Sequence, residues 1–258
     1  MKLLFSVFLI GLSIVIANEG MPKPFSSANK VLSMVIAFSL NRMDPLLITM
    51  RGHQAMCEAG WDVNFVIFTA HKVSLRYRRY LEAKLYCHRI QSNIPLIISE
   101  HDPSVHIGLV EETRAYLRSH WEQYDVYIYM EEDVIVEFQH LVGYLSESLK
   151  LQNLIGKEEA MSKYHIGFQR YRRHLLPMEG KKTKMGEEEV LLQEYLEEVP
   201  FFKPVCFKDQ PYMHVQGNKR VPAANVYQAM WILTREQLGV LQGKCKFLDQ
   251  TFKGTPME

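Results

Sequence analysis

Three consecutive acids, Glu131, Glu132 and Asp133, follow an aromatic and β-branched run that spans residues 124 to 130. Such a run is typical of a buried strand. Three carboxylates at the carboxyl end of a strand repel one another, so we expect a metal ion, a basic side chain or open water to meet them. Alternate side chains of an extended backbone point the same way, so Glu131 and Asp133 can approach one cation while Glu132 faces away.

The kind of ligand atom indicates which cation the acids would bind. Carboxylate oxygens suit Mg²⁺ or Mn²⁺. These ions bind through one or two carboxylates and complete their shells with phosphate oxygens and water, so the trio suggests a substrate that carries a diphosphate. The alternative interpretation is a strand that runs into a solvated acidic turn.

Strands and helices alternate along the chain before the acids. We expect strands and helices in turn at residues 31–38, 44–59, 62–69, 74–86, 94–99, 110–123 and 124–131. Pro95 near the start of the third strand indicates an edge position. Crossovers of this length join parallel strands. The order predicts an α/β fold with a doubly wound, mainly parallel sheet and helices on both faces, whose ligands bind outside the carboxyl ends of the strands.

The chain beyond the acids has a mixed pattern. A helix is expected at 140–151, and a strand that begins near Tyr164 leads into a basic cluster. A charged loop at 181–189 precedes a short amphipathic segment at 190–196. Repeated prolines between residues 198 and 222 indicate irregular loops or edge strands. The pattern ends with a strand at 225–234, a helix at 235–242 and an unstructured tail from residue 247.

The amino-terminal sequence is typical of a targeting segment. An uncharged run from Leu3 to Ala17 follows Lys2 and precedes polar residues, which fits either a signal peptide cleaved after Ala17 or a membrane anchor. Residues 18–29 then form a stem. Both alternatives place the remainder in the secretory pathway, in the ER or Golgi lumen or outside the cell.

The cysteines and the net charge limit the partners. In an oxidising compartment the four cysteines can form two disulfides, whose pairing does not follow from the sequence. No short CxxC pair exists, which argues against a zinc site. The net charge is +1, so no global field attracts nucleic acid, and any basic site must be local.

Several common enzyme signatures are missing from the sequence. No Gly-x-Gly-x-x-Gly follows the first expected strand, and the sequence contains no Gly-x-x-x-x-Gly-Lys-Ser/Thr. These absences argue against dehydrogenases and common ATPases. Gly-x-Ser-x-Gly is absent too, which argues against a hydrolase with a nucleophile elbow.

The parallel half, the acids after its fourth strand and the mixed half behind a leader together resemble the GT-A class of glycosyltransferases. Glu131-Glu132-Asp133 resembles the Asp-x-Asp motif of that class. Residues 30–69, 124–136 and 165–173 are also similar to eukaryotic nucleotide-diphospho-sugar transferase-like proteins. The resemblance implies that Asp133 binds Mn²⁺ or Mg²⁺ between the two phosphates of a nucleotide sugar, and that Glu131 faces the ribose or the metal shell.

The same resemblance divides the chain and suggests further site residues. It implies a nucleotide-binding half at 30–136 and a mixed, acceptor-side half at 137–258. His214 can be a late metal ligand or a structural histidine, and the expected position of Arg170, Arg172 and Arg173 beyond a strand would let them balance the diphosphate or lie on a solvated surface. Spacing does not separate the candidates for a general base, which are Glu187, Glu188, Glu189 and Asp209. Tyr227 and Trp231, in an apolar run, are interpreted as core residues.

These observations favour a metal-dependent glycosyltransferase that moves a sugar from a nucleotide-sugar donor to a glycan, protein or lipid acceptor. The stereochemistry of transfer stays open. One alternative is a noncatalytic binding or scaffold domain with the same fold. The other is a metal-dependent phosphohydrolase, which would normally use more acidic or histidine ligands than one trio supplies.

Overall fold

The structure of the chain is a computed structural model that describes residues 29–38, 43–163, 171–177, 192–198, 213–216, 219–222 and 230–249. Side chains are described for most of residues 29–161 and 230–249. The expected leader, nearly all of the stem, and Arg170 therefore lie outside the described residues. No helix in the described ranges is long and apolar enough to cross a membrane.

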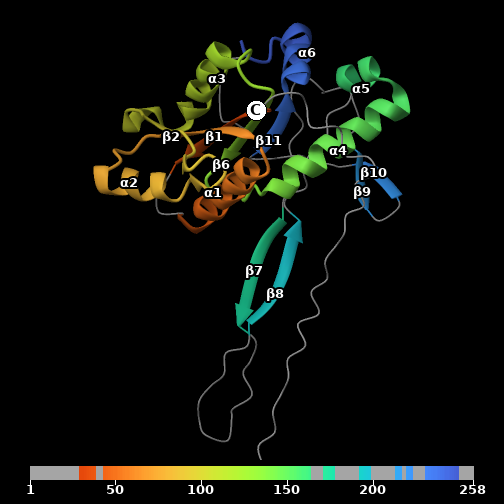
Figure 1. Cartoon of the computed structure of the whole chain (residues 1–258). Helices are drawn as coiled ribbons and strands as arrows, with labels where there is room; N and C mark the ends of the chain where they lie inside the picture. The colour runs from red at the N-terminus through yellow and green to blue at the C-terminus, as the bar shows by residue number, and fades with distance from the viewer. Residues whose placement is uncertain are drawn as a thin grey trace, which may run out of the picture.

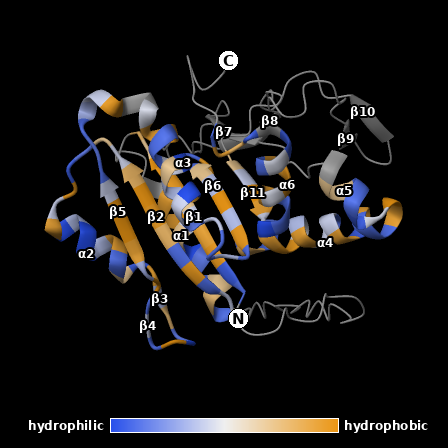
Figure 2. Cartoon of the chain, turned by 90° about the horizontal axis from the view of Figure 1, so that it is seen from above, coloured by the Kyte–Doolittle hydropathy of each residue, from blue (hydrophilic) through white to orange (hydrophobic). Residues whose placement is uncertain are grey.

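A five-stranded sheet forms the centre of the fold, and four of its strands are parallel. The spatial order is β11-β6-β1-β2-β5, with β11 antiparallel to β6, and Figure 2 shows the strands side by side in this order. β5 lies at one edge, as Pro95 predicted. The strands are β1 (Lys30–Ala37), β2 (Asp62–Thr69), β5 (Leu96–Glu100), β6 (Val126–Glu131) and β11 (Met230–Thr234).

Helices cover both faces of the sheet, which is why nearly every residue of β1 is buried. One apolar cluster joins the sheet to α1 (Met43–Glu58) and α4 (Phe138–Ile155). The other joins it to α3 (Leu109–His120) and α6 (Arg235–Cys245). Figure 1 shows α3 and α6 above the sheet and α1 below it. The predicted α/β class, with a doubly wound and mainly parallel sheet, is confirmed.

α1 approaches the loop between β6 and α4 closely at a glycine. A Cβ atom on Gly52 would lie 2.4 Å from the carbonyl oxygen of Val136 and 2.8 Å from the Cα of Glu137, so no larger residue fits there without movement of the backbone. The helix ends at Glu58, and Gly60 follows with a φ of +105°, a conformation that glycine adopts without strain. The helix predicted at 44–59 therefore ends within one residue of the observed end.

A small substructure follows β2. Ser74 caps α2 (Leu75–Ala83), because its side chain accepts a hydrogen bond from the Tyr77 backbone. The helix was predicted to extend to Tyr86, but that residue belongs to the short strand β3 (Tyr86–Cys87), which pairs with β4 (Ser92–Asn93). A disulfide joins Cys57 to Cys87 and fastens this hairpin to α1. The 3₁₀ helix η1 (Pro103–Gly108) connects β5 to α3.

The second half differs from its predicted pattern in several places. The helix α4 is longer than expected, and α5 (Lys157–Lys163) was not predicted. Arg172 and Arg173 are inside β7 (Tyr171–Pro177) and do not follow its end, whereas the strand expected from Tyr164 lies outside the described residues. β7 pairs with β8 (Leu192–Glu198), and β9 (Met213–Gln216) pairs with β10 (Lys219–Pro222). The amphipathic segment at 190–196 is thus largely a strand.

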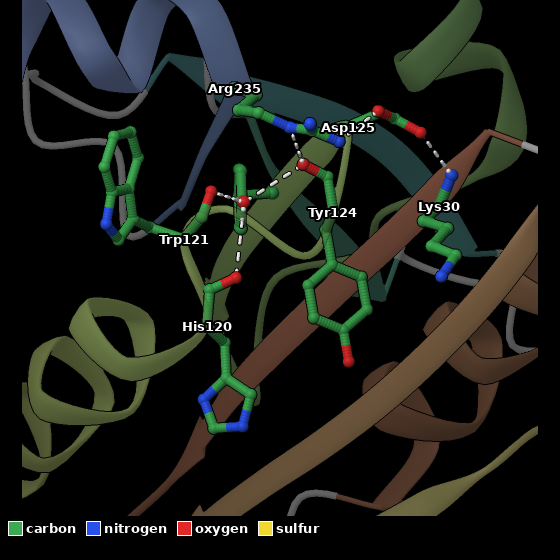
Figure 3. Close-up of polar contacts among 7 residues, drawn as sticks. Lys30, His120, Trp121, Tyr124, Asp125 and Arg235 are labelled. Carbon is green, nitrogen blue, oxygen red and sulfur yellow. Dashed lines mark hydrogen bonds and ion pairs between the residues drawn. The ribbon is translucent and has the colours of Figure 1, made fainter.

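The amino edge of the sheet is held by Asp125, which immediately precedes β6. Its Oδ2 accepts a hydrogen bond from the Lys30 backbone at 2.9 Å, and its Oδ1 forms an ion pair with Arg235 at 2.5 Å. Arg235 also donates from Nε to the Tyr124 carbonyl. Figure 3 shows these contacts drawing together the starts of β1, β6 and α6. One carboxylate therefore connects three elements that are distant in sequence.

Candidate functional site

The crevice expected in this fold lies at the carboxyl ends of β1 and β6. From β1 the chain crosses to β2 and β5 on one side, and it then returns through α3 to β6 on the other side. Neighbouring parallel strands whose connections leave in opposite directions form a topological switch point, where open α/β sheets bind their ligands. Glu131, Glu132 and Asp133 follow directly at this position.

The middle acid of the trio has a structural role. Glu132 is 4% exposed, and its Oε2 accepts a hydrogen bond from the Phe38 backbone at 2.5 Å. Its own backbone N–H donates to Ile36 at 2.9 Å. Glu132 thus joins the end of β6 to the end of β1, and a buried carboxylate bonded in this way stabilises the contact.

The expectation that Glu132 simply faces away assumed an extended backbone through Asp133. β6 instead ends at Glu131, and Glu132 and Asp133 lie in a turn. Strand alternation therefore does not apply beyond Glu131. Glu131 and Asp133 are both half-buried, whereas Glu132 is the buried member.

α1 supports the loop that follows the acids. The buried hydroxyl of Thr49 donates to the Val134 carbonyl at 3.0 Å and accepts from the Val136 backbone at 3.1 Å. One turn further along the helix, Gly52 leaves room for the same loop at Val136. The backbone just beyond Asp133 is therefore fixed by one hydroxyl group and one close approach.

A buried histidine joins α1 to β1 behind this loop. His53 is fully buried, with its Nδ1 2.7 Å from the Thr49 carbonyl and its Nε2 2.5 Å from the Ser33 hydroxyl. A carbonyl only accepts, so Nδ1 carries the proton and Nε2 accepts from Ser33. Burial lowers the pKa of His53 to about 4, against the opposing effect of the Thr49 hydrogen bond. His53 is neutral at physiological pH.

Two histidines that sequence reasoning did not select lie at the same edge of the sheet. His71 places Nε2 2.9 Å from the Phe38 carbonyl, so both backbone groups of Phe38 are held. His101, after β5, lies 2.8 Å from the Ser99 hydroxyl and 3.8 Å from a carboxylate oxygen of Glu112. The only available signal was their position just after expected strands, because neither residue belongs to a recognisable motif.

The donor set at the acids fits a hard cation only if a substrate completes its shell. Among the described residues no group of three or more His, Cys, Asp and Glu side chains converges on a metal position. Glu131 and Asp133, which are both half-buried, flank the structural Glu132. Mg²⁺ and Mn²⁺ accept one or two carboxylates together with phosphate oxygens and water. Within the described part of the chain, the acids therefore do not form an all-protein metal cage.

The other expected site residues lie in the less completely described second half. Arg170 and the candidate bases Glu187, Glu188, Glu189 and Asp209 are outside the described residues. Arg172 lies in β7 opposite Glu197, and His214 lies in β9 opposite Val221. The structure describes only the backbone at both of these positions.

Trp231 occupies the position of a core residue. Its ring stacks on that of Tyr129 at 5.4 Å between centroids and meets Phe247 edge-on at 5.9 Å. All three rings pack against the apolar cluster beneath α3 and α6. This packing agrees with the interpretation of Trp231 as a core residue.

Comparisons with known proteins give no sequence match and a partial structural similarity. Protein-family models give no match, and neither do curated proteins compared by sequence. A structural comparison matches core-mannan synthase A (CmsA/Ktr4) from Aspergillus fumigatus in its Mn/GDP form, with a TM-score of 0.27 and 11% identity. The match covers 51% of this chain and 42% of that chain, so it spans less than half of that protein. At this TM-score the similarity carries no argument about function.

The disulfide bears on the compartment in which the chain folds. Cys57 and Cys87 pair across 30 residues, between α1 and β3. Disulfides of this kind persist in oxidising compartments and are rare in the cytosol. The pair is consistent with the secretory pathway indicated by the amino-terminal sequence.

Proposed function

We propose that this protein is a metal-dependent glycosyltransferase of the secretory pathway, which transfers a sugar from a nucleotide-diphosphate sugar. One observation carries the proposal. The three acids at the carboxyl end of β6, Glu131 in the strand and Glu132 and Asp133 just after it, lie beside the end of β1 at the switch point of a doubly wound sheet. Hard oxygen ligands at this position suit a cation that accompanies a diphosphate.

The proposed roles of the acids differ. Glu131 and Asp133 would hold Mn²⁺ or Mg²⁺, while Glu132 keeps the ends of β1 and β6 together. A cation bound there would act as a Lewis acid and stabilise the charge on the departing nucleoside diphosphate. Thr49 keeps the loop after Asp133 in place. Rigid support of this kind favours catalysis because the binding groups need no rearrangement.

The second half of the chain would complete the site. In this proposal residues 30–136 bind the nucleotide and residues 137–258 form the acceptor side. Arg170 and Arg172 would balance the diphosphate charge, and His214 would be an additional metal ligand. The acceptor would be a glycan, a protein or a lipid.

A noncatalytic binding domain of the same fold is the second candidate. It is favoured by the structural use of Glu132 and by the absence of a three-ligand cluster among the described residues. A metal-dependent phosphohydrolase is less well supported, because two carboxylates fall short of the usual ligand set for metal-activated water.

A donor screen separates these candidates. The protein is incubated with the common nucleotide sugars with Mn²⁺, with Mg²⁺ or with a chelator, and release of nucleoside diphosphate is measured. Metal-dependent release from one donor supports a transferase, and release that increases with an added acceptor distinguishes it from a phosphohydrolase. Calorimetric binding of metal and nucleoside diphosphate without turnover would indicate the binding domain. The absence of both turnover and binding would overturn the proposal.

A further inference from the structure

Positive charge is concentrated in one segment of an otherwise balanced chain. Residues 71–97 contain six lysines and arginines and one acid, whereas the whole chain has a net charge of +1. The segment comprises α2, the β3–β4 pair and the beginning of β5. Figure 2 shows these elements together on the β5 side of the molecule. The basic residues therefore belong to one end of the fold.

The exposed side of α2 carries this charge outward. Its exposed residues are Leu75, Arg76, Arg79, Tyr80 and Ala83, followed by Lys84 at the C-cap. At 3.6 residues per turn these positions share one side of the helix, and we call them the α2 outer surface. Opposite them, Leu81 is fully buried. None of the residues on the α2 outer surface is acidic, and the half-buried Glu82 lies at its margin.

The cations of this surface differ from the paired arginine of the same helix. Arg78 lies at the inner side and pairs with Glu100 at 3.4 Å. Neither Arg76 nor Arg79 has an ion pair with a carboxylate among the described residues, and both are exposed. The ammonium of Lys84 lies 5.2 Å from the centre of the Tyr80 ring. The outer surface thus carries three cations, with Glu82 at its margin as the acid of the same helix, and its net charge is positive.

Exposed apolar side chains gather in the same segment. Five of the eight large hydrophobic residues that are exposed in the described chain lie between residues 75 and 97. Leu75 is 62% exposed and Tyr80 is 43% exposed. Cations beside exposed leucine and tyrosine are typical of protein surfaces that lie at a membrane interface. A soluble polyanion would use the cations but would gain nothing from the exposed leucine.

The segment that follows α2 is held to α1 by a disulfide and several hydrogen bonds. The disulfide between Cys57 and Cys87 fastens β3, which follows α2, to α1. Arg89 donates to the carbonyls of Cys57 and Trp61, and Glu58 accepts from the backbone of residues 88 and 89. A surface that needs no ordering on binding loses less conformational entropy.

We propose that the α2 outer surface is a docking site for an anionic lipid bilayer. Arg76, Arg79 and Lys84 would meet acidic headgroups, while Leu75 and the Tyr80 ring would enter the boundary between headgroups and acyl chains. The β5 end of the molecule would then face the membrane. This contact is independent of the reaction proposed above and of the nature of the amino terminus.

Vesicle binding tests this proposal with the full chain. The probes are vesicles of phosphatidylcholine alone, vesicles that also contain phosphatidylserine, and dextran sulfate as a soluble polyanion. The variants are Arg76→Gln/Arg79→Gln and Leu75→Ser, and the matched control is Lys150→Gln/Lys157→Gln, which removes the same charge from exposed positions on α4 and α5. All variants share one amino terminus, so any contribution from it is common to them.

The two changes on α2 should act differently on the probes. Arg76→Gln/Arg79→Gln should lower partitioning onto the phosphatidylserine vesicles about tenfold, while the control stays near wild type. Leu75→Ser should lower it about fivefold and leave dextran sulfate binding unchanged. Equal melting temperatures would show that every variant folds.

Three outcomes would overturn the proposal. The first is an absence of preference for phosphatidylserine vesicles in the wild-type protein. The second is an equal loss in the Lys150→Gln/Lys157→Gln control, which would indicate a general charge effect. The third is unchanged vesicle binding in Leu75→Ser, with loss of dextran sulfate binding in Arg76→Gln/Arg79→Gln. That pattern would identify a site for a soluble polyanion.

Discussion

The two ends of β6 both carry acids, but the contacts and the burial of these acids differ. At the amino end Asp125 has Arg235 and the Lys30 backbone as partners within the chain. At the carboxyl end three acids follow one another, and only Glu132 is buried. A single acid beside an arginine forms an ion pair that links two elements. Three successive acids repel one another, and a nearby positive charge stabilises them. The comparison separates acids that hold the sheet together from acids that can serve a ligand.

Glu132 shows that this separation does not follow the sequence motif. It belongs to the trio by position but resembles Asp125 in its contacts, because each carboxylate accepts a hydrogen bond from backbone near one end of β1. The candidate ligands are therefore Glu131 and Asp133. Four substitutions or conditions test this division, and they are ordered by expected effect.

The largest expected effect belongs to Asp133→Asn. Loss of one carboxylate charge from a metal ligand should lower turnover by about two to three orders of magnitude. In the protein without ligand, the change relieves repulsion from Glu131 and Glu132, so the melting temperature should stay equal or rise slightly. Turnover is measured by nucleoside diphosphate release, and melting is measured with and without Mn²⁺ and nucleoside diphosphate.

The isosteric change at the other end of the strand, Asp125→Asn, is the control for this experiment. It should leave the rise in melting temperature caused by Mn²⁺ and nucleoside diphosphate unchanged. An equal rise in wild type and in Asp133→Asn would remove Asp133 from the proposed metal site. A fall in the melting temperature of unliganded Asp133→Asn would instead assign this acid to a structural ion pair.

Acid should weaken the support behind the carboxyl end through His53. Its folded pKa of about 4 lies below the unfolded value of 6.5, so the unfolded chain binds more protons between these values. The contribution of His53 is complete above pH 6.5 and is lost as the pH falls toward 4. The free energy of unfolding should decrease by about 3 kcal/mol across this range.

Urea denaturation at several pH values measures this change, and NMR of the imidazole resonances assigns it. Burial also lowers the pKa of His140, which acts in the same direction. The resonance of His53 should not titrate between pH 7 and 5. A His53 midpoint near 6.5 would show that the imidazole is not buried as described.

Glu132→Ala tests whether the middle acid is structural. It removes the acceptor of the Phe38 N–H at a part-buried position and should lower the free energy of unfolding by about 2 kcal/mol. Glu132→Gln keeps an oxygen acceptor and should recover most of that loss. Chemical denaturation compares the two variants. Equal stability of Glu132→Ala and wild type would contradict the assignment.

The smallest expected effect is that of Asp125→Asn on stability. Its ion pair with Arg235 is 43% exposed on both sides, and exposed pairs contribute little because solvent screens them. The free energy of unfolding should fall by about 1 kcal/mol or less, with no change in nucleotide release. A change in nucleotide release equal to that of Asp133→Asn would show that the two ends of β6 do not have separate roles.

Much of the first half was predictable because local patterns there agree with the tertiary environment. The second strand was predicted at residues 62–69, which are the bounds of β2. A helix was also expected to begin at Ser74, and α2 follows directly after this residue, which caps it. In the second half, strand patterns are interrupted by prolines, so residues 192–196 of the expected amphipathic segment were not recognised as part of β8. Expectations for Arg170 and the leader stay predictions.

The sequence by itself determined the α/β class and the position of the acids after a buried strand, because hydrophobic periodicity and strand order are local properties. It did not determine that Glu132 is the buried member, since that depends on where β6 ends and on the backbone of Phe38, 94 residues away. Nor did it reveal the contact of Thr49 with Val134 and Val136. Only the tertiary structure decides such contacts, because the parallel sheet brings together strand ends that are separated in the chain by whole crossovers.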